Sequence, residues 1–246
     1  DVNDVEIGAN VVAYPWIGCG ECAACKAGDE HYCNAPRQLG IQLPGGFADY
    51  CVAGTTHTYK LPNEIDGKTG AAVQVLTTVL HAQDNGGVGE GDTVTVTGLG
   101  VTGLMHIQLA KARGAKHVIG VSRNAHKREV ALALGADAAV THGADAKKAV
   151  LDNTGGVGAD VVIECVGAMP VLAEAMDLAR LGGRLIPFAI YPSGKAELPF
   201  YDLYFKELQV LNARAAKGRD FEECIKLVGD GSVDLGALVT HALPYT

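Results

Sequence analysis

Aromatic residues are scarce in this chain, since Phe, Trp and Tyr make up 6% of its 246 residues and there is one Trp. A hydrophobic core must therefore be built mainly from Ala, Val, Leu and Ile. The chain also lacks an excess of basic residues, because 20 Lys and Arg stand against 28 Asp and Glu. Nucleic-acid binders usually carry a basic stripe that pairs with phosphates, so the composition argues against that class.

Long apolar runs are absent as well, and none reaches the ~18 residues of a membrane-spanning helix. Residues 1–4 lack the basic and apolar regions of a signal peptide. We therefore predict no membrane association and a cytoplasmic location. The chain does not begin with Met, and we expect that it starts within a longer protein.

Glycine, by contrast, is abundant, with 32 residues of 246 against an average of roughly 7%. No three-residue period accompanies it, so these glycines mark turns and close backbone approaches. Residues 1 to about 70 are rich in turns and contain short apolar segments, such as 11–14 and 47–52, that we interpret as strands.

From about residue 90 the pattern alternates between strand, glycine turn and helix. We expect strands at 93–97, 118–121, 161–163, 185–190 and 208–211. One helix follows the turn at 98–103 and ends at Gly114, a second ends at Gly135, and a third covers about 171–179 and is closed by Gly182 and Gly183. Continuous apolar strands that alternate with helices predict an α/β fold with a parallel sheet buried on both faces.

Four of the seven cysteines fall within 15 residues, with the spacing Cys-x2-Cys-x2-Cys-x7-Cys. They are Cys19, Cys22, Cys25 and Cys33. Structural zinc takes four thiolates in a tetrahedron, at about 2.3 Å each, and keeps no open position for catalysis. Free thiols, two disulfides and an iron–sulfur cluster are the alternatives, although the proline-terminated run of bacterial ferredoxins is absent. We predict a structural zinc site and a reducing compartment. The other cysteines are interpreted as core residues: Cys51, Cys165 and Cys224.

Residues 98–103 read Gly-Leu-Gly-Val-Thr-Gly, directly after a predicted strand and before a helical pattern. The G-x-G-x-x-G pattern is weak alone, but this context is the one that binds a dinucleotide. Gly98 permits the tight turn, Gly100 lets the backbone approach a pyrophosphate, and Gly103 lets helix and strand pack closely. Val101, in the same turn, completes the predicted phosphate contact.

The choice of cofactor depends on the residue at the end of the second strand. An acidic residue about 20 positions after the last glycine normally holds the ribose 2′-hydroxyl of NAD. Here Ser122 stands 19 positions after Gly103, and Arg123 and Lys127 follow it. A hydroxyl beside an arginine attracts the 2′-phosphate of NADP, whereas a carboxylate would repel it. The alternative is that Arg123 and Lys127 are simply solvent-exposed basic residues at the start of a helix. The pattern favours NADP, with NAD as the second choice.

These motifs, in this order, resemble the zinc-dependent alcohol dehydrogenases of the medium-chain dehydrogenase/reductase superfamily. The matching segments are 14–22, 28–33, 36–40, 46–50, 164–167 and 238–241. The resemblance covers essentially the whole chain.

The resemblance implies a doubly wound Rossmann sheet and part of a GroES-like β domain. It assigns residues 1–73 to the GroES-like catalytic domain, 74–213 to the Rossmann domain, and 214–246 to a helix and the return to the catalytic domain. It implies hydride transfer between NAD(P) and an alcohol or carbonyl substrate, assisted by a catalytic zinc that polarises the substrate oxygen. A homo-oligomer, dimer or tetramer, is implied too.

The chain departs from the family at the catalytic zinc. In the family, two ligands of the catalytic zinc, a Cys and the His of a Gly-His-Glu motif, precede the segment that carries the four clustered cysteines (residues 19–33, the cysteine loop). No Cys or His stands upstream of Tyr14 here. The resemblance therefore implies that the chain lacks the first part of the protein, and residues 241–246 resemble a point before its end. We expect the chain as given to be inactive.

The third ligand position of the family falls on Gln74, whose amide is a poor zinc ligand. Thr78, one helical turn further, and Val166 match cofactor contacts of the family. Gln74 favours one alternative, an NADPH-dependent quinone or enoyl reductase without catalytic zinc. A nucleotide-binding relative without catalysis is a second alternative. His106 and His117 are predicted as surface or boundary residues.

Overall fold

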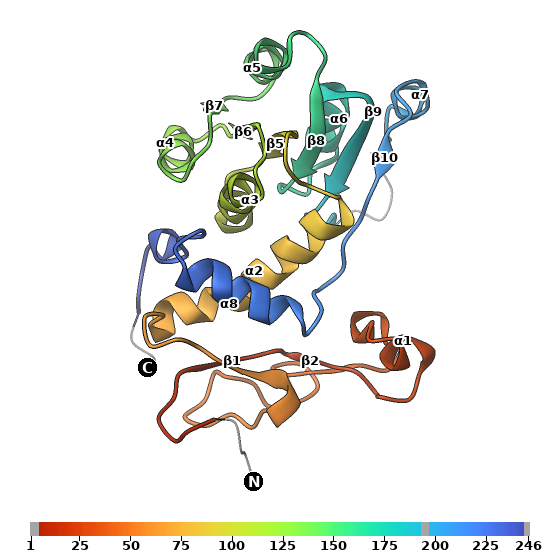
Figure 1. The fold of residues 1–246 in the computed structure, drawn as a ribbon. Coiled ribbons are helices and arrows are strands. Elements are labelled where there is room, and N and C mark those ends of the chain that lie inside the picture. Colours follow the sequence, from red (N-terminus) through yellow and green to blue (C-terminus); the bar gives the residue numbers. More distant parts are fainter. Residues whose placement is uncertain (1–4, 193–196, 244–246) are drawn as a thin grey trace. The chain divides into compact units, whose positions relative to one another are not determined.

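The computed structural model describes residues 5–192 and 197–243, and the chain divides into two compact units (Figure 1). The first unit comprises residues 1–81, 214–231 and 235–246, and the second comprises residues 82–213 and 232–234. Residues 1–4 and 244–246, on which the predictions about the chain's ends partly rest, lie outside the described residues.

A six-stranded sheet forms the centre of the second unit, with the strand order β10-β9-β8-β5-β6-β7 (Figure 1). Its strands are β5 (Thr93–Thr97), β6 (His117–Val121), β7 (Ala138–Val140), β8 (Ala159–Glu164), β9 (Ala179–Pro187) and β10 (Gln209–Val210). Every pairing between neighbours is parallel. The predicted parallel sheet is therefore confirmed.

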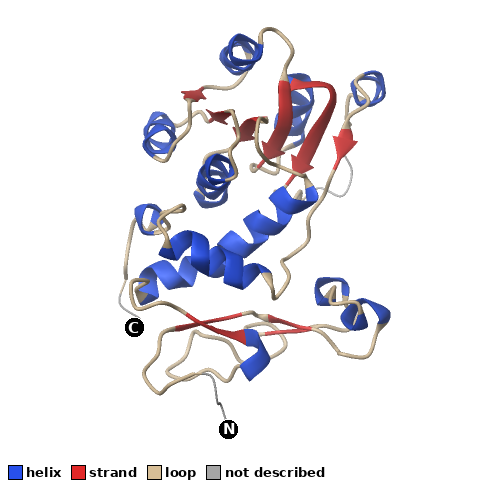
Figure 2. Cartoon of the chain, viewed as in Figure 1, coloured by secondary structure: helices blue, strands red, loops and turns tan. Residues whose placement is uncertain are grey.

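Helices cover both faces of this sheet (Figure 2). The helices α3 (Val101–Ala112) and α4 (Ala125–Ala133) contact each other and pack on β6, whereas α5 (Ala144–Thr154) and α6 (Met169–Leu178) contact each other and pack on β8. A short helix, α7 (Phe200–Phe205), precedes β10. The strand side chains Val94, Val118 and Val162 have no exposed surface, as expected of a sheet enclosed by two helical layers.

Short antiparallel strand pairs and two long helices build the first unit. The strand β1 (Val11–Ala13) pairs with β4 (Thr58–Lys60), and β2 (Trp16–Ile17) pairs with β3 (Arg37–Gln38). Its helices are α1 (Ala23–Lys26), α2 (Gly67–Asn85), whose last four residues belong to the second unit, and α8 (Asp220–Gly229). Three 3-10 turns complete it: Glu30–Tyr32, Thr55–His57 and Gly236–Leu238. Phe221 is fully buried and stacks on Tyr59 at 4.8 Å.

The prediction of a strand at 47–52 is wrong. These residues form bends and loop, and Phe47, Tyr50 and Val52 are almost fully exposed. A strand persists only where a neighbour satisfies its backbone groups, and no described segment pairs with this one. For the same reason Cys51 is exposed and is not a core cysteine.

Three further local predictions are corrected. The third helix ends at Leu178, so Gly182 and Gly183 lie inside β9 and do not close a helix. The helix after the glycine turn begins at Val101, within the predicted turn. His106 is fully buried against Phe188 rather than at the surface, and burial lowers its pKa to about 3, so the imidazole is neutral.

No helix among the described residues is both long enough and apolar enough to cross a membrane.

Candidate functional site

The four clustered cysteines meet in one place in the first unit. Their sulfur atoms all lie within 4.8 Å of one another, and the Sγ atoms of Cys19 and Cys25 are 4.0 Å apart. A tetrahedral zinc with bonds of about 2.3 Å needs sulfurs separated by about 3.8 Å. The helix α1 presents Cys25, while Cys33 follows the 3-10 turn at Glu30–Tyr32 and is buried. The sulfurs therefore fit one metal ion without rearrangement of the chain.

Backbone N–H groups surround these sulfurs as they would surround thiolates. Cys33 Sγ accepts hydrogen bonds from the N–H groups of Cys19 at 3.3 Å and Ala35 at 3.4 Å, and Cys19 Sγ accepts one from Cys22 at 3.4 Å. Hydrogen bonds from the backbone of Glu21 and Cys22 lower the pKa of Cys19 to about 6. Against a hydrogen bond from the backbone of Gly20, burial and the neighbouring cysteines raise the pKa of Cys25 to about 12. Because zinc binds the thiolate and not the thiol, Cys19 is ready to bind a metal, whereas Cys25 must first lose its proton.

The cysteine loop is anchored to a distant segment of the same unit. Lys217 Nζ lies 2.7 Å from Asp29 Oδ1, and the N–H group of Gly218 donates to Glu30 Oε1 at 3.0 Å. The indole of Trp16 donates to the carbonyl of Glu30 at 2.8 Å. A metal in the cysteine site would consequently order residues far away in the sequence.

In the second unit, the predicted glycine turn joins β5 to α3. Gly98 has a φ of +92°, which favours glycine, and Gly103 packs so closely that an added Cβ would lie 1.9 Å from the carbonyl oxygen of Gly98. Gly100 differs from both, because nothing lies within 4 Å of the position of its Cβ. Gly98 and Gly103 are thus required by the fold, whereas Gly100 leaves open space at the N-terminus of α3.

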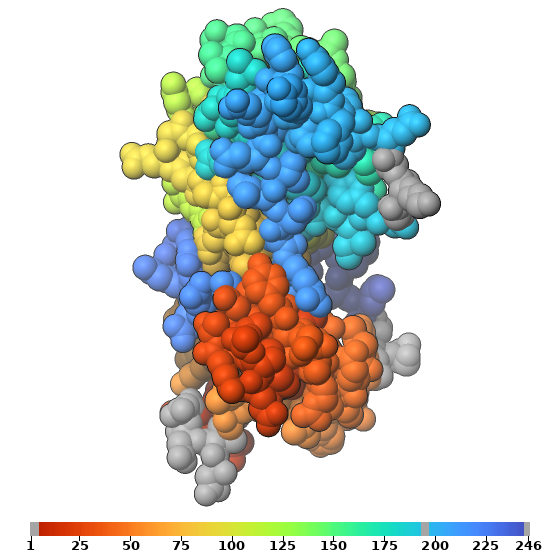
Figure 3. Space-filling model, turned by 90° about the vertical axis from the view of Figure 1, so that its right-hand side faces the viewer, coloured from red at the N-terminus to blue at the C-terminus, as the bar shows by residue number. Residues whose placement is uncertain are grey.

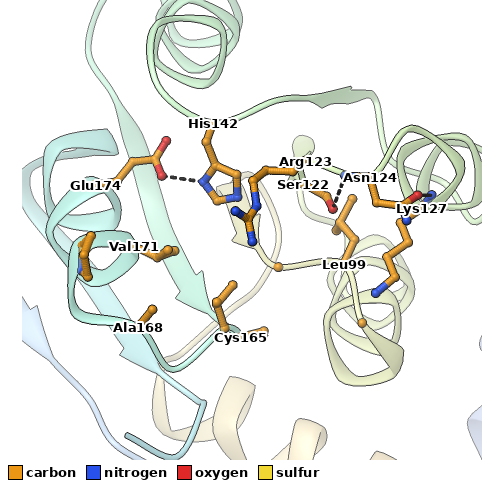
Figure 4. A pocket seen from close by; sticks show the side chains of 14 residues that line it. Leu99, Ser122, Arg123, Asn124, Lys127, His142, Cys165, Ala168, Val171 and Glu174 are labelled. Carbon is orange, nitrogen blue, oxygen red and sulfur yellow. Dashed lines mark hydrogen bonds and ion pairs between the residues drawn. The ribbon is translucent and has the colours of Figure 1, made fainter. Parts of the chain in front are cut away.

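That open space belongs to a cleft of about 800 Å³ (Figure 4). Its lining comes from the turns that follow β5, β6, β7 and β8, at their carboxyl ends, and from the helices α4 and α6. The lining residues are Gly98, Leu99, Gly100, Ser122, Arg123, Asn124, Lys127, His142, Cys165, Val166, Ala168, Pro170, Val171 and Glu174. The strand β5 is also where the strand order reverses, because β6 and β8 lie on its two sides. Ligands of open α/β sheets bind at such a switch point.

The predicted cofactor-selecting residues gather at one end of this cleft. Ser122 follows β6 and is buried, with its Oγ accepting the N–H group of Asn124 at 3.3 Å. The side chains of Arg123 and Lys127 are exposed, and neither forms an ion pair with another described residue. The guanidinium of Arg128 is occupied, because it donates to the carbonyl of Ser122 at 2.7 Å. Two unpaired cations thus line the cleft beside a serine hydroxyl.

The turn after β8 forms the opposite wall. The buried carboxylate of Glu164 accepts the N–H groups of Val166 at 2.7 Å and Gly167 at 3.1 Å. The hydroxyl of Tyr191 donates to the same carboxylate. These bonds fix the backbone that carries Cys165 and Val166 along the cleft.

Two of the predicted residues belong to the first unit. Gln74 and Thr78 lie in the middle of α2, in the part that belongs to the first unit, and both are partly buried. The hydroxyl of Thr78 donates to the carbonyl of Val75 at 2.7 Å. Val101 opens α3 next to the cleft but does not line it.

Sequence reasoning missed three polar residues of the cleft. Asn124 caps α4, since its Oδ1 accepts the N–H group of Lys127 at 3.1 Å, and an Asn before a helical run is a recognisable start signal. His142 and Glu174 form a pair, with 2.5 Å between Nδ1 and Oε2. They lie 32 residues apart, and no local pattern predicts that they meet.

Two family models match the chain. The model of the alcohol dehydrogenase GroES-like domain matches residues 1–63, and that of zinc-binding dehydrogenases matches residues 101–230.

Named enzymes are similar over nearly the whole chain. A sorbitol dehydrogenase of Halalkalibacterium halodurans is 34% identical over 91% of this chain and 66% of its own length. A 2-dehydro-3-deoxy-L-galactonate 5-dehydrogenase of Pseudoalteromonas atlantica is 31% identical over 99% of this chain and 71% of its own. An L-threonine 3-dehydrogenase of Pyrococcus abyssi is 32% identical over 98% and 69%. The chain thus spans about two thirds of the length of these relatives.

Solved structures agree with these similarities. A protein of Sinorhizobium meliloti, described as a zinc-binding dehydrogenase bound to NADP, matches with a TM-score of 0.87 at 34% identity, over 95% of this chain and 69% of that one. An alcohol dehydrogenase from Thermus matches with a TM-score of 0.86 at 25% identity, over 98% and 72%. The predicted family resemblance and fold class are confirmed.

Proposed function

This chain belongs to the zinc-binding dehydrogenases with an alcohol dehydrogenase GroES-like domain, a family of oxidoreductases, and we propose that the whole protein transfers hydride between NAD(P) and an alcohol or the corresponding carbonyl compound. The observation that carries the proposal is the cleft at the switch point of the parallel sheet, which opens directly over the glycine turn. Named relatives that span most of the chain are dehydrogenases of polyols and hydroxy acids, which supports this reaction class.

The residues of the cleft suit the parts of a dinucleotide. The open position at Gly100 leaves room for a pyrophosphate against the N–H groups that open α3. Ser122, Arg123 and Lys127 bind the adenosine ribose and favour a 2′-phosphate, while Val166 contacts the cofactor from the wall beyond β8. The bound nicotinamide supplies or accepts the hydride. NADP in a structural relative supports this preference, and NAD remains the second cofactor.

The cysteine cluster fits a structural zinc, which would hold the loop at 19–33 in place. A catalytic zinc has no comparable site here. Among the described residues, the four cysteines are the one cluster of three or more metal-ligating side chains, and the predicted third ligand is an amide, Gln74. An amide is a poor zinc ligand, so the described residues form no complete catalytic zinc site.

Gln74 therefore favours a second candidate, a reductase of quinones or enoyl compounds that uses NADPH without a catalytic zinc. A non-catalytic nucleotide-binding protein is the third. Metal analysis of the full-length protein separates these functions, since two zinc ions per chain support the dehydrogenase and one supports either rival. Turnover of polyols, L-threonine and simple alcohols with NADP and NAD, compared with quinones and enoyl compounds with NADPH, then distinguishes the remaining candidates. If the protein binds a cofactor but turns over none of these substrates, both proposed enzymatic functions are wrong.

The preference for NADP predicts the effect of Ser122→Asp. A carboxylate at the end of β6 repels a 2′-phosphate and accepts the ribose hydroxyls of NAD. It can also still accept the N–H group of Asn124, so the local turn is preserved. We expect the NADP-to-NAD ratio of affinities to fall at least ~10-fold. Titrations with both cofactors measure this ratio, and Ser122→Ala, which introduces no charge, is the control. An unchanged ratio in the aspartate variant would refute the assignment of Ser122.

We also propose that the protein is a homo-oligomer, dimer or tetramer, through the face of α7 and β10. Four exposed aromatic side chains cluster on α7: Phe200, Tyr201, Tyr204 and Phe205. The adjacent β10 is an edge strand. Residues 200–210 lie on the side of the molecule that faces the viewer in Figure 3. Exposed aromatic patches and open strand edges are both typical of subunit interfaces.

The double variant Tyr201→Asp/Phe205→Asp is expected to dissociate this oligomer into monomers, because two charges would have to be buried in the interface. Light scattering after size-exclusion chromatography measures the mass. Leu132→Asp, at an exposed apolar position on α4, which packs on the opposite edge strand β7, is the matched control and should leave the mass unchanged. The face is not the interface if the double variant keeps the mass of the unmodified protein.

We assign the protein to the reducing cytosol. The four clustered cysteines could hold a metal, and a metal-binding thiolate cluster needs a reducing environment.

A further inference from the structure

A cavity of about 290 Å³ in the first unit has no part in the function derived so far. Three segments that are distant in the sequence contribute to it. The lining residues are Tyr14, Gly18, Gly20, Cys25, Glu30, Thr56, His57, Tyr59 and Gly218. All of them belong to the first unit. Ligand pockets of proteins measure about 300–1,000 Å³, so a cavity at the lower end of this range suits a ligand of few atoms.

Glu30, in the cysteine loop, supplies a carboxylate to this cavity. Its Oε1 atom accepts the N–H group of Gly218 at 3.0 Å, and among the described residues its Oε2 atom has no hydrogen-bond partner. No cation in the described part of the chain forms an ion pair with this carboxylate, and Lys217, next to Gly218, pairs with Asp29 instead at 2.7 Å. One carboxylate oxygen is therefore available to a ligand.

Three groups of the lining meet at one position beside Gly218. A Cβ atom added to this glycine would lie 2.9 Å from the hydroxyl oxygen of Tyr59, 3.3 Å from Glu30 Oε1 and 3.6 Å from a ring carbon of Tyr14. A hydroxyl oxygen, a carboxylate oxygen and an aromatic ring thus converge from residues far apart in the sequence. The absence of a side chain at Gly218 is what leaves this position free of protein atoms.

Aromatic rings form the other walls of the cavity. The rings of Tyr14 and His57 are nearly parallel, with their centroids 5.9 Å apart. The ring of Tyr59 is held in place by Phe221, which stacks on it at 4.8 Å. The faces of tyrosine rings carry partial negative charge and attract cations.

The electrostatic potential around these rings is negative as well. Burial is the main cause that raises the pKa of Tyr14, and the carboxylates of Glu30 and Asp220 raise it further. The pKa of Tyr59 is likewise raised by burial and then by Glu222, Glu30 and Asp220. Negative charge that disfavours a phenolate favours a cation at the same place.

We propose that this cavity binds a small organic cation, a protonated amine or a guanidinium ion, with Glu30 as its counterion. The N–H donors of such a cation suit the available oxygen of Glu30 and the hydroxyl oxygen of Tyr59, and the rings of Tyr14 and Tyr59 add cation–π attraction. Because Glu30 and Gly218 belong to distant segments, the bound cation also strengthens the contact between the cysteine loop and the segment that follows β10. The inference does not depend on the proposed dinucleotide function.

Calorimetric titration of the full-length protein with guanidinium chloride and with ethylammonium chloride tests the proposal, at an ionic strength held constant with sodium chloride. Urea has the shape of guanidinium without its charge and is the matched control. We expect a dissociation constant below ~5 mM for at least one of the two cations, and binding of urea at least ~10-fold weaker than that. Weaker binding of both cations, or a smaller difference from urea, overturns the proposal.

Glu30→Gln locates the bound cation. The amide keeps the size of the side chain and an oxygen that accepts the N–H group of Gly218, so it removes only the charge. We expect the cation to bind at least ~10-fold more weakly, whereas the melting temperature without ligand stays within about 2 °C. Gly218→Ala, which places a methyl group where the three groups meet, should weaken the cation equally and serves if Glu30→Gln does not fold.

Glu222→Gln is the matched control for the loss of charge. This exposed carboxylate also acts on Tyr59 but does not line the cavity, so the affinity for the cation should stay within 2-fold. Tyr59→Phe keeps the ring stacked on Phe221 and should weaken the cation only ~2- to 5-fold, through the lost hydroxyl. Unchanged affinity in Glu30→Gln, or an equal loss in Glu222→Gln, would show that the cation binds elsewhere and would overturn the assignment of this cavity.

Discussion

Replacement of Cys33 by serine is expected to remove the bound zinc and to lower the melting temperature by about 10 °C. Cys33 is the buried member of the cluster, and its sulfur accepts two backbone N–H groups. Serine cannot supply the thiolate that zinc requires, so the remaining three sulfurs lose a tetrahedral partner. Loss of a structural metal belongs to the few single changes that cost about 4 kcal/mol or more.

The effect should extend beyond the cysteine loop. The contacts from Asp29 to Lys217 and from Glu30 to Gly218 join this loop to the segment that follows β10. Hydrogen exchange of residues 214–220 should therefore increase in the serine variant and after removal of zinc with a chelator.

Cys51→Ser provides the matched control. Cys51 lies in the same unit, is exposed and is no member of the cluster, so its replacement should change stability by less than about 0.5 kcal/mol. Zinc content is measured together with melting temperature. Retention of one zinc per chain in Cys33→Ser would contradict the four-sulfur site. Iron with visible absorption in the unmodified protein would indicate a cluster instead.

Gly103→Ala is expected to abolish cofactor binding, with a loss of at least ~100-fold in affinity, and to destabilise the second unit. The new Cβ would lie 1.9 Å from the carbonyl oxygen of Gly98, far inside contact distance. The helix α3 can accept it only by moving away from the end of β5, which displaces the N–H groups that are proposed to hold the pyrophosphate.

Gly100→Ala separates binding from folding. Its backbone has a φ of −77° and a ψ of −170°, which alanine adopts, and nothing lies within 4 Å of its Cβ position. The melting temperature should therefore stay unchanged, whereas the cofactor should bind at least ~10-fold more weakly because the methyl group occupies the pyrophosphate space. Calorimetry and thermal unfolding of both variants measure this. Full affinity in Gly100→Ala would mean that no phosphate lies against this turn.

Much of the second unit was predictable because its signals are local. A buried parallel strand such as β5 appears as a continuous β-branched run, and the turn at Gly98 appears as a glycine pattern. The spacing of Cys19 to Cys33 equally brings four sulfurs together through one short loop. In each case the chemistry depends on residues that are close in sequence.

The errors arose where a residue's environment depends on distant partners. The apolar segment 47–52 suggests a strand, but strands need a neighbour, and none of the described segments supplies one. His106 looked like a boundary residue, although the second unit buries it against Phe188 and lets Gln83 donate to its Nδ1 atom at 3.2 Å. Polarity alone does not reveal whether a side chain will find such a partner.

The sequence by itself determined the alternation of strands and helices, the cysteine spacing and the glycine turn, because backbone sterics and short-range geometry act within a few residues. The tertiary structure alone decided which side chains share the cleft. Only the order of the strands brings the turn after β7 and the helix α6 beside Arg123, and only that proximity gives His142 a carboxylate partner 32 residues away. Contacts across such separations follow from the packing of the whole sheet, which no local pattern encodes.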